Sequence, residues 1–309
     1  MILSAGLTPA WQQILVFDWF RYGEVNRAAE VHWCASGKVF NAGIAVHHLG
    51  GESLTLATAG GLPLMPIRAE MESLGVPLEI VETESATRVC TTMLDRRTGT
   101  MTELVENGRP LSESELEAYA ARFFEAAGEA EVVTFIGTLP RGTPPSYYRR
   151  LLENVSCPTV LDFRGEGLLG CLELKPTVIK PNREELERTV GHALDSNESL
   201  LAAMRSCNER GARWVVITDG PRAVWLTSRN ETYRFPPPTV PQSDVVNPIG
   251  SGDSMAAAIA WAVRDGLSMP EAVRLGIGAS VDNLAQLLPC RLCPDRVRKI
   301  ADTVRIESQ

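Results

Sequence analysis

Short runs of apolar, β-branched residues alternate with longer stretches of helical periodicity along most of the 309-residue chain. This alternation constrains the fold more than any other feature, because it is typical of β-α-β units and a mostly parallel sheet. Five of the runs are predicted strands, and three of the segments between them are predicted amphipathic helices. The strands are Leu54–Thr58, Val132–Ile136, Thr159–Phe163, Thr177–Ile179 and Trp214–Thr218, and the helices are Glu113–Ala127, Arg183–Val190 and Ser199–Arg210.

Two regions, Gln13–Trp33 and Thr87–Glu106, interrupt this rhythm. Polar and β-prone residues alternate in both, and the turn Arg96-Arg97-Thr98-Gly99 joins two extended pieces as in a hairpin. We therefore predict a small β element attached to the α/β core. No repeat or linker divides the sequence, so residues 1–309 are predicted to form one domain, with the β element built from insertions at about 8–34 and 86–107.

Charge and cysteine content narrow the class of partner. Thirty Lys and Arg against 38 Asp and Glu give a formal net charge of −8, which argues against a nucleic-acid binder that relies on neutralising phosphates. Seven scattered cysteines are typical of reduced thiols and predict a cytoplasmic protein. Cys290 and Cys293 have the spacing of half a zinc site, but no second pair lies near them. No apolar run approaches the ~20 residues of a membrane span, so no membrane partner is expected.

The most informative motif is Asn247-Pro-Ile-Gly250-Ser251-Gly252-Asp253, which precedes a helix of small residues. Two glycines one residue apart allow a tight turn, and a helix that begins there presents unpaired N–H groups to an anion. Asp253 would lie beside a phosphate held in this cradle, where it could accept a proton from an attacking hydroxyl. The motif alone leaves open a second interpretation, in which Asp253 only caps the helix.

Two further segments follow predicted strands. Lys180-Pro-Asn182-Arg-Glu-Glu185 ends one strand and begins a helix, for which a capping role would suffice. A functional role would place Asn182 and Glu185 at the carboxyl edge of the sheet, where ligands of open α/β sheets bind, with Glu185 near a hydrated Mg²⁺. Thr218-Asp-Gly220 follows another strand at the same edge, although such a sequence is usually only a turn.

Two basic residues are candidates for anion binding. Lys38, one of only four lysines, follows Gly37 at the start of a predicted helix, and Arg88 lies in the hairpin region. Either could reach an anionic substrate, and either could be an ordinary surface charge.

Motifs of other enzyme classes are either absent from the sequence or lack the secondary structure that they require. Gly165-Glu-Gly-Leu-Leu-Gly170 matches the dinucleotide fingerprint, but Pro176 leaves no room for the long helix that this motif requires. A Walker A loop and a Gly-x-Ser-x-Gly elbow are both absent.

The order of these motifs resembles that of the PfkB (ribokinase-like) carbohydrate kinases over nearly the whole chain. The resemblance rests on Gly250–Asp253 after Asn247-Pro248, on Lys180–Glu185, and on Gly37-Lys38-x-x-Asn41. Further segments are similar to the branch of 1-phosphofructokinase and tagatose-6-phosphate kinase, namely Thr8-Pro9-Ala10, Thr87-Arg88 with Thr102-Glu103, and Gly137-Thr-Leu-Pro-Arg-Gly142.

The resemblance implies a three-layer α/β/α sandwich with a mostly parallel central sheet and a small β-sheet lid. It also implies transfer of the γ-phosphoryl group of ATP, with Mg²⁺, to a hydroxyl of a sugar phosphate of the fructose-1-phosphate or tagatose-6-phosphate type. Asp253 would be the general base, and Gly250, Ser251 and Gly252 would form the anion hole. The implied nucleotide-site residues are Asn182, Glu185 (holding the metal through water), Thr218, Gly220 and Asn283, and the implied sugar-site residues are Gln12, Gly37, Lys38, Asn41 and Arg88.

The sugar half departs from the family pattern while the ATP half keeps it. Gln12 replaces a carboxylate expected to bind sugar hydroxyls, and Val39 and Cys90 replace a Gly and an Asn of the family. Two alternatives therefore remain: a kinase of an unphosphorylated sugar or a nucleoside, and a non-catalytic sensor of sugar phosphates or nucleotides. A homodimer formed through the lid is also expected.

Overall fold

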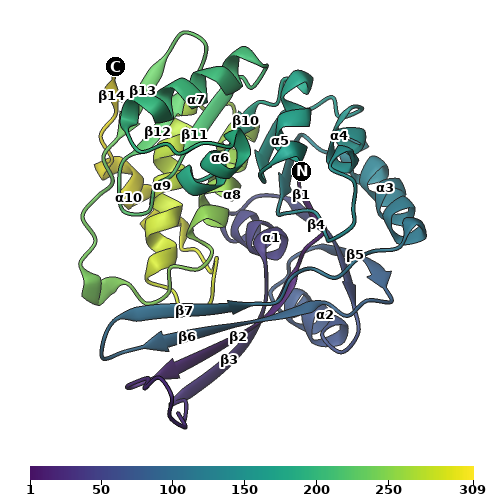
Figure 1. Ribbon diagram of the computed structural model, residues 1–309, viewed down its shortest axis with the longest axis vertical. Coiled ribbons are helices and arrows are strands. Elements are labelled where there is room, and N and C mark those ends of the chain that lie inside the picture. The colour runs from purple at the N-terminus through teal and green to yellow at the C-terminus, as the bar shows by residue number, and fades with distance from the viewer.

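The computed structural model describes residues 1–309 as a ten-stranded sheet covered by helices on both faces, with a separate four-stranded sheet at one end (Figure 1). Seven neighbouring strands of the large sheet are parallel and the last three are antiparallel. In spatial order they are β5 (Leu78–Thr83), β4 (Ser53–Gly60), β1 (Ile2–Gly6), β8 (Val132–Ile136), β9 (Thr159–Asp162), β10 (Val178–Ile179), β11 (Trp214–Ile217), β12 (Val224–Thr227), β13 (Thr232–Phe235) and β14 (Glu307–Ser308).

Two hydrophobic clusters lie on opposite faces of this sheet. The central strands β1 and β8 are buried along their whole length, as their continuous apolar sequences require between two helix layers. One layer contains α1 (Lys38–His48), α2 (Leu64–Ser73), α8 (Ser251–Arg264), α9 (Met269–Leu284) and α10 (Pro294–Thr303). The other contains α3 (Glu113–Gly128), α4 (Ser146–Leu152), α5 (Glu166–Cys171), α6 (Arg183–Val190) and α7 (Asn197–Glu209), and two short 3₁₀ turns lie at Leu172–Leu174 and Gln242–Asp244.

These layers confirm the predicted α/β/α sandwich, with small shifts at element ends. β4 is three residues longer than its predicted strand, and α7 begins at Asn197 because Ser196 caps it by accepting from the N–H of Ser199. The segment after Gly165 forms only the six-residue α5, too short for the dinucleotide fingerprint that it resembles.

The small sheet consists of β3 (Glu30–Ser36), β2 (Ala10–Phe17), β6 (Arg88–Asp95) and β7 (Thr100–Val105), in that order. β6 and β7 form the expected hairpin, closed by the turn before Gly99, whose φ is +65°. Since β2 pairs with β6 in parallel, the two sequence insertions meet in one sheet that extends beyond α1 and α2 (Figure 1).

No helix of the structure is both long enough and apolar enough to span a bilayer. All seven cysteines are free.

Candidate active site

A polar cleft of about 360 Å³ lies between the inner face of the small sheet and the carboxyl edge of the central strands. Residues from distant parts of the sequence line it. They include most of the predicted site: Gln12, Gly37, Lys38, Asn41, Arg88, Asn182, Glu185, Thr218, Gly250, Ser251, Gly252 and Asp253.

The start of α8 forms one wall of the cleft. Gly250 is its N-cap with φ +86°, a left-handed conformation that favours glycine, and a Cβ there would lie 3.0 Å from Cys290 Sγ. No side chain caps the helix, so N–H groups of its first turn, apart from that of Ser251, which donates to Pro248 O at 3.3 Å, remain available to an anion. The capping interpretation of Asp253 is therefore wrong, because this residue lies within the first turn and its carboxylate accepts from another element.

Asp253 is buried, with 7% of its surface exposed. Its Oδ2 accepts a hydrogen bond of 2.7 Å from Nδ2 of Asn41, whose Oδ1 accepts from the hydroxyl of Ser36 at 3.2 Å. Burial raises the pKa of Asp253 to about 6, while Lys38 and the Asn41 amide oppose this rise. The carboxylate is thus oriented by α1 and is mostly ionised at neutral pH.

Beside Asp253 lies a chain of four charges. Lys38 Nζ contacts Asp162 Oδ1 at 2.8 Å and Glu185 Oε1 at 3.1 Å, and Lys180 Nζ contacts Asp162 Oδ2 at 3.0 Å. Burial favours the neutral form of Asp162, but Lys180 and Lys38 outweigh burial and lower its pKa. For Lys38, burial is likewise outweighed by Asp162 and Glu185, which raise its pKa. Lys38 therefore stays charged in the cleft.

Sequence reasoning missed Asp162 and did not assign Lys180 to the site. Their signal was positional, because Asp162 is the last residue of β9 and Lys180 directly follows β10, at the same carboxyl edge of the sheet. A Cβ at Gly252 would lie 3.7 Å from Lys180 Nζ, which places this ammonium group beside the anion cradle.

Asn182 and Glu185 form a reciprocal capping box at the start of α6. Asn182 Oδ1 accepts from the Glu185 N–H at 2.7 Å, and Glu185 Oε2 accepts from the Asn182 N–H at 3.0 Å. The capping role is therefore real, yet both residues also line the cleft. The cap fixes the Glu185 carboxylate so that its other oxygen faces Lys38.

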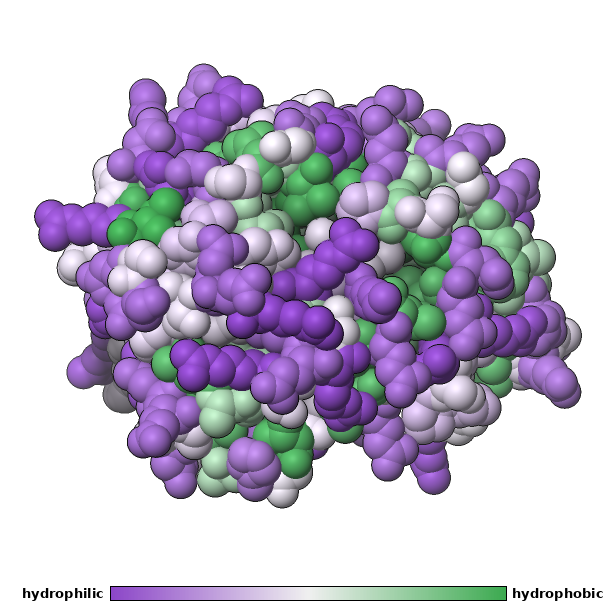
Figure 2. Space-filling model, turned by 90° about the horizontal axis from the view of Figure 1, so that it is seen from above, coloured by the Kyte–Doolittle hydropathy of each residue, from purple (hydrophilic) through white to green (hydrophobic).

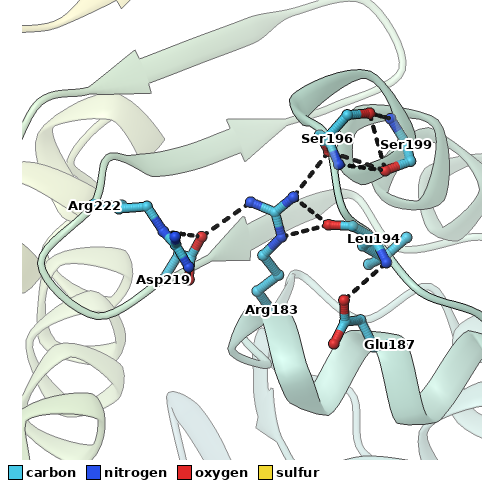
Figure 3. Close-up of polar contacts among 7 residues, drawn as sticks. All are labelled: Arg183, Glu187, Leu194, Ser196, Ser199, Asp219 and Arg222. Atoms are coloured by element: carbon cyan, nitrogen blue, oxygen red, sulfur yellow. Dashed lines mark hydrogen bonds and ion pairs between the residues drawn. The ribbon is translucent and has the colours of Figure 1, made fainter.

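Next to this cap, Arg183 connects three segments (Figure 3). Its guanidinium group pairs with Asp219 at 3.0 Å and donates to the carbonyl oxygens of Leu194 and Ser196. Asp219 also accepts from Arg222, and although burial favours its neutral form, the two arginines lower its pKa. This network holds the end of β11 against α6, so that Thr218 bridges to Asn182 at the edge of the cleft.

On the small sheet, Gln12 Nε2 donates to Thr92 Oγ1 at 2.7 Å, and Gln12 Oε1 has no protein partner. Arg88 donates to the carbonyl oxygens of Pro9, Glu106 and Thr8. Glu103, which sequence reasoning did not assign, also lines the cleft, and burial raises its pKa while Arg88 opposes the rise.

Two predicted nucleotide residues lie outside the cleft lining. Asn283 is fully buried behind the cradle, where its Nδ2 donates to Ile249 O at 2.8 Å and to Ser251 Oγ at 3.0 Å. Its Oδ1 accepts from the N–H of Cys290. Asn283 thus holds the backbone of the cradle from its buried side instead of facing a ligand. Gly220 lies in the turn after β11 with φ +54° and does not line the cleft.

The acidic groups of the cleft suit a metal ion that is coordinated mainly by phosphate oxygens and water. No group of three or more His, Cys, Asp or Glu side chains is placed to hold a metal ion. Magnesium in phosphoryl-transfer sites commonly keeps waters and takes oxygens from the phosphates, with one or two protein carboxylates nearby. Glu185, whose two oxygens already accept hydrogen bonds, suits contact through water.

Solved structures with this fold are similar over almost the full chain. A protein from Thermotoga maritima described as a possible 1-phosphofructokinase is 17% identical with a TM-score of 0.90, and covers 100% of this chain and 99% of its own. Phosphofructokinase-2 from Escherichia coli in complex with fructose-6-phosphate is 24% identical with a TM-score of 0.86, covering 98% and 99%. The tetrameric inhibited form of that enzyme is 23% identical with a TM-score of 0.87, covering 97% and 98%.

A family model described as the pfkB family carbohydrate kinase matches residues 2–281, which is most of the sequence. The match includes the cradle, the charge chain and the small sheet. The chain therefore belongs to the pfkB family of carbohydrate kinases, phosphotransferases whose acceptor is an alcohol group.

Proposed function

We propose that this chain transfers the γ-phosphoryl group of ATP to a hydroxyl of a sugar phosphate, with Asp253 as the general base. One observation carries the proposal: the Asp253 carboxylate is buried, oriented by Asn41, and located in the first turn of a helix whose N-terminus is uncapped. A buried carboxylate, an uncapped helix N-terminus and two lysine side chains therefore meet in a single cleft, which supports this proposal.

Phosphoryl transfer requires alignment and charge stabilisation more than covalent help from the protein. The N–H groups at the start of α8 and the Lys180 ammonium would bind negative charge on the transferring group. Asp253 Oδ would accept the proton of the acceptor hydroxyl. Mg²⁺, when bound with ATP, supplies further charge neutralisation near Glu185.

The acceptor would lie under the small sheet. Gln12 Oε1 lacks a protein partner and can accept a hydrogen bond from a sugar hydroxyl, which offsets part of the loss of a carboxylate at this position. Arg88 retains N–H groups beyond those given to backbone carbonyls, so it can still bind a phosphate. That the similar E. coli enzyme binds fructose-6-phosphate supports a phosphosugar acceptor.

One observation favours the alternative of an unphosphorylated acceptor. Lys38, expected to face a substrate phosphate, is held by Asp162 and Glu185, so its charge is already compensated. Arg88 would then be the main cation on the acceptor side that faces the cleft. A neutral sugar or nucleoside has no phosphate and would not require a cation on the acceptor side of the cleft.

An ADP-release assay across neutral sugars, nucleosides and phosphosugars tests the proposal. We expect turnover with at least one phosphosugar and much weaker turnover with its neutral counterpart. The reverse preference would establish the alternative acceptor class. Stabilisation by AMP-PNP in a thermal-shift assay without turnover of any acceptor would instead establish a sensor.

We also propose a homodimer formed through the small sheet, in a cytoplasmic setting that suits seven free thiols. The outer face of this sheet carries the exposed side chains of Val31, Trp33 and Leu104, with Trp33 stacked 6.0 Å from Trp11. Figure 2 views the molecule from above Figure 1, on the side away from the small sheet, and the surface there is mainly hydrophilic with scattered apolar areas. Val31 and Trp33 lie on the same face of β3, and exposed apolar side chains gathered on one face suit an interaction surface.

A further inference from the structure

A partly buried ion pair connects the small sheet to the loop that supports the anion cradle. Glu70 of α2 pairs through Oε1 with Nη2 of Arg291 at 2.6 Å, although 221 residues separate them. Both side chains are mostly shielded, with exposures of 18% and 14%. Arg291 Nη1 is buried without a partner, so Glu70 is the only anion that holds this guanidinium group.

On one side the link reaches the small sheet. The other oxygen of Glu70, Oε2, accepts from the backbone N–H of Ala35 at 2.5 Å. β3 is an edge strand, so this N–H points away from its only neighbour and needs a partner outside the sheet. Ala35 is followed by Ser36 and Gly37, which line the acceptor side of the cleft.

On the other side the link reaches the cradle. Cys290, next to Arg291 in the chain, lies directly behind Gly250: its Sγ is 3.4 Å from Gly250 O and 3.2 Å from Ser254 Oγ. The N–H of Cys290 is held by Asn283, which also holds Ile249 and Ser251. A displacement of the cradle would therefore be transmitted to residue 291 through packed, fully buried atoms.

We propose that the Glu70–Arg291 pair is a positioning link that couples occupation of the anion cradle to the placement of β3 at the acceptor side of the cleft. This inference rests on the proposed function, because it takes the nucleotide to be the ligand of the cradle. Glu70 and Arg291 do not line the cleft, so they act through Ala35 and Cys290 and not by touching substrate.

Hydrogen exchange in β3 tests the link without requiring the acceptor to be known. The measured quantity is the ratio of exchange rates for residues 31–36 without and with AMP-PNP and Mg²⁺. We expect nucleotide to slow exchange about fivefold in the wild type, within the usual range of coupling between sites. Glu70→Gln, which keeps an acceptor for Ala35 but removes the charge, and Arg291→Met should reduce this ratio to below about twofold.

Glu82→Gln is the matched control. Glu82 of β5 pairs at 2.7 Å with Arg68, which lies in α2 like Glu70. Both side chains are well exposed, and neither lines the cleft. This variant should keep the wild-type ratio. Full nucleotide-dependent slowing in Glu70→Gln and Arg291→Met would overturn the link, provided that both variants bind AMP-PNP in a thermal-shift assay. Failure of the wild type to bind AMP-PNP would instead refute the proposed function, and the inference with it.

Discussion

Asn41 of α1 donates a 2.7 Å hydrogen bond to the carboxylate of Asp253 at the start of α8, across 212 residues of sequence. The amide group thereby fixes the direction of the carboxylate and stabilises its charged form in a buried environment. α1 and α8 pack together against the central sheet, so the scaffold itself sets this contact.

Replacing Asp253 with Asn should lower kcat by about 10² or more, because the amide cannot accept the proton of the acceptor hydroxyl. Affinity for ATP should change little, since the first N–H groups of α8 and Lys180 remain. Steady-state kinetics and AMP-PNP binding measure the two effects. Asp244→Asn, at an exposed position earlier in the same segment, is the control. Wild-type turnover in the Asp253 variant would remove Asp253 from the mechanism.

The same substitution should stabilise the fold at high pH. The folded-state pKa of Asp253 is raised to about 6 from 3.8, so the fold favours the protonated carboxyl, and stability falls as pH rises from about 4 through 6. At pH 8 Asp253→Asn should raise the free energy of unfolding by up to about 3 kcal/mol, the equivalent of this pKa difference. Denaturant titrations at pH 8 and pH 4 measure the gain, which should shrink at the lower pH. An equal gain in the free energy of unfolding at pH 8 and pH 4 would show that the gain does not come from the ionisation of Asp253.

Activity should depend on the ionisation of Asp253. Since the base must be deprotonated, kcat/KM should fall as pH drops below about 6. Asn41→Leu removes the donor that stabilises the carboxylate, so the acidic limb of the profile should move to higher pH by about one unit, on the scale of a hydrogen bond to a charged group. A lower kcat/KM with an unmoved acidic limb would show that Asn41 acts only on the substrate.

Neutralising Arg88 should distinguish the acceptor classes. Arg88→Met should lower kcat/KM for a phosphosugar by about 10² if the guanidinium group binds its phosphate, and should leave a neutral acceptor within about threefold. Combining it with Lys38→Met tests whether Lys38 adds to this effect. Arg97→Met, on the exposed hairpin turn, is the control. Circular dichroism checks folding, because Lys38→Met leaves Asp162 and Glu185 with less compensation.

Trp33 should contribute to the proposed homodimer. It is 43% exposed on β3, and Trp33→Lys would place a charge in an apolar interface, which should weaken self-association by about tenfold or more. Light scattering coupled to size exclusion measures the mass. Phe124→Lys, at a similarly exposed aromatic on α3, should leave the mass unchanged. A monomeric wild type would refute the dimer.

Local pattern predicted much of this molecule. The apolar runs at Val132–Ile136 and Trp214–Ile217 coincide with strands, because a strand buried on both faces needs continuous apolar residues. The helix start at Gly250–Gly252 was also predictable, since two glycines one residue apart allow a tight turn, and Gly250 adopts the left-handed conformation that favours glycine. The two polar β regions formed a separate sheet, as their alternation and the Arg96–Gly99 turn indicated.

Tertiary packing decided the surroundings of the individual side chains in the candidate site. Whether Asp253 caps its helix or faces a cleft depends on Asn41, and the charge state of Lys38 depends on Asp162 and Glu185, all of which are distant in sequence. Similarly, nothing local distinguishes an Asn283 that faces a ligand from one that braces the cradle. Hydrogen bonds and charges act over a few ångströms of space, and a chain read in one dimension shows which groups are available but not which of them meet.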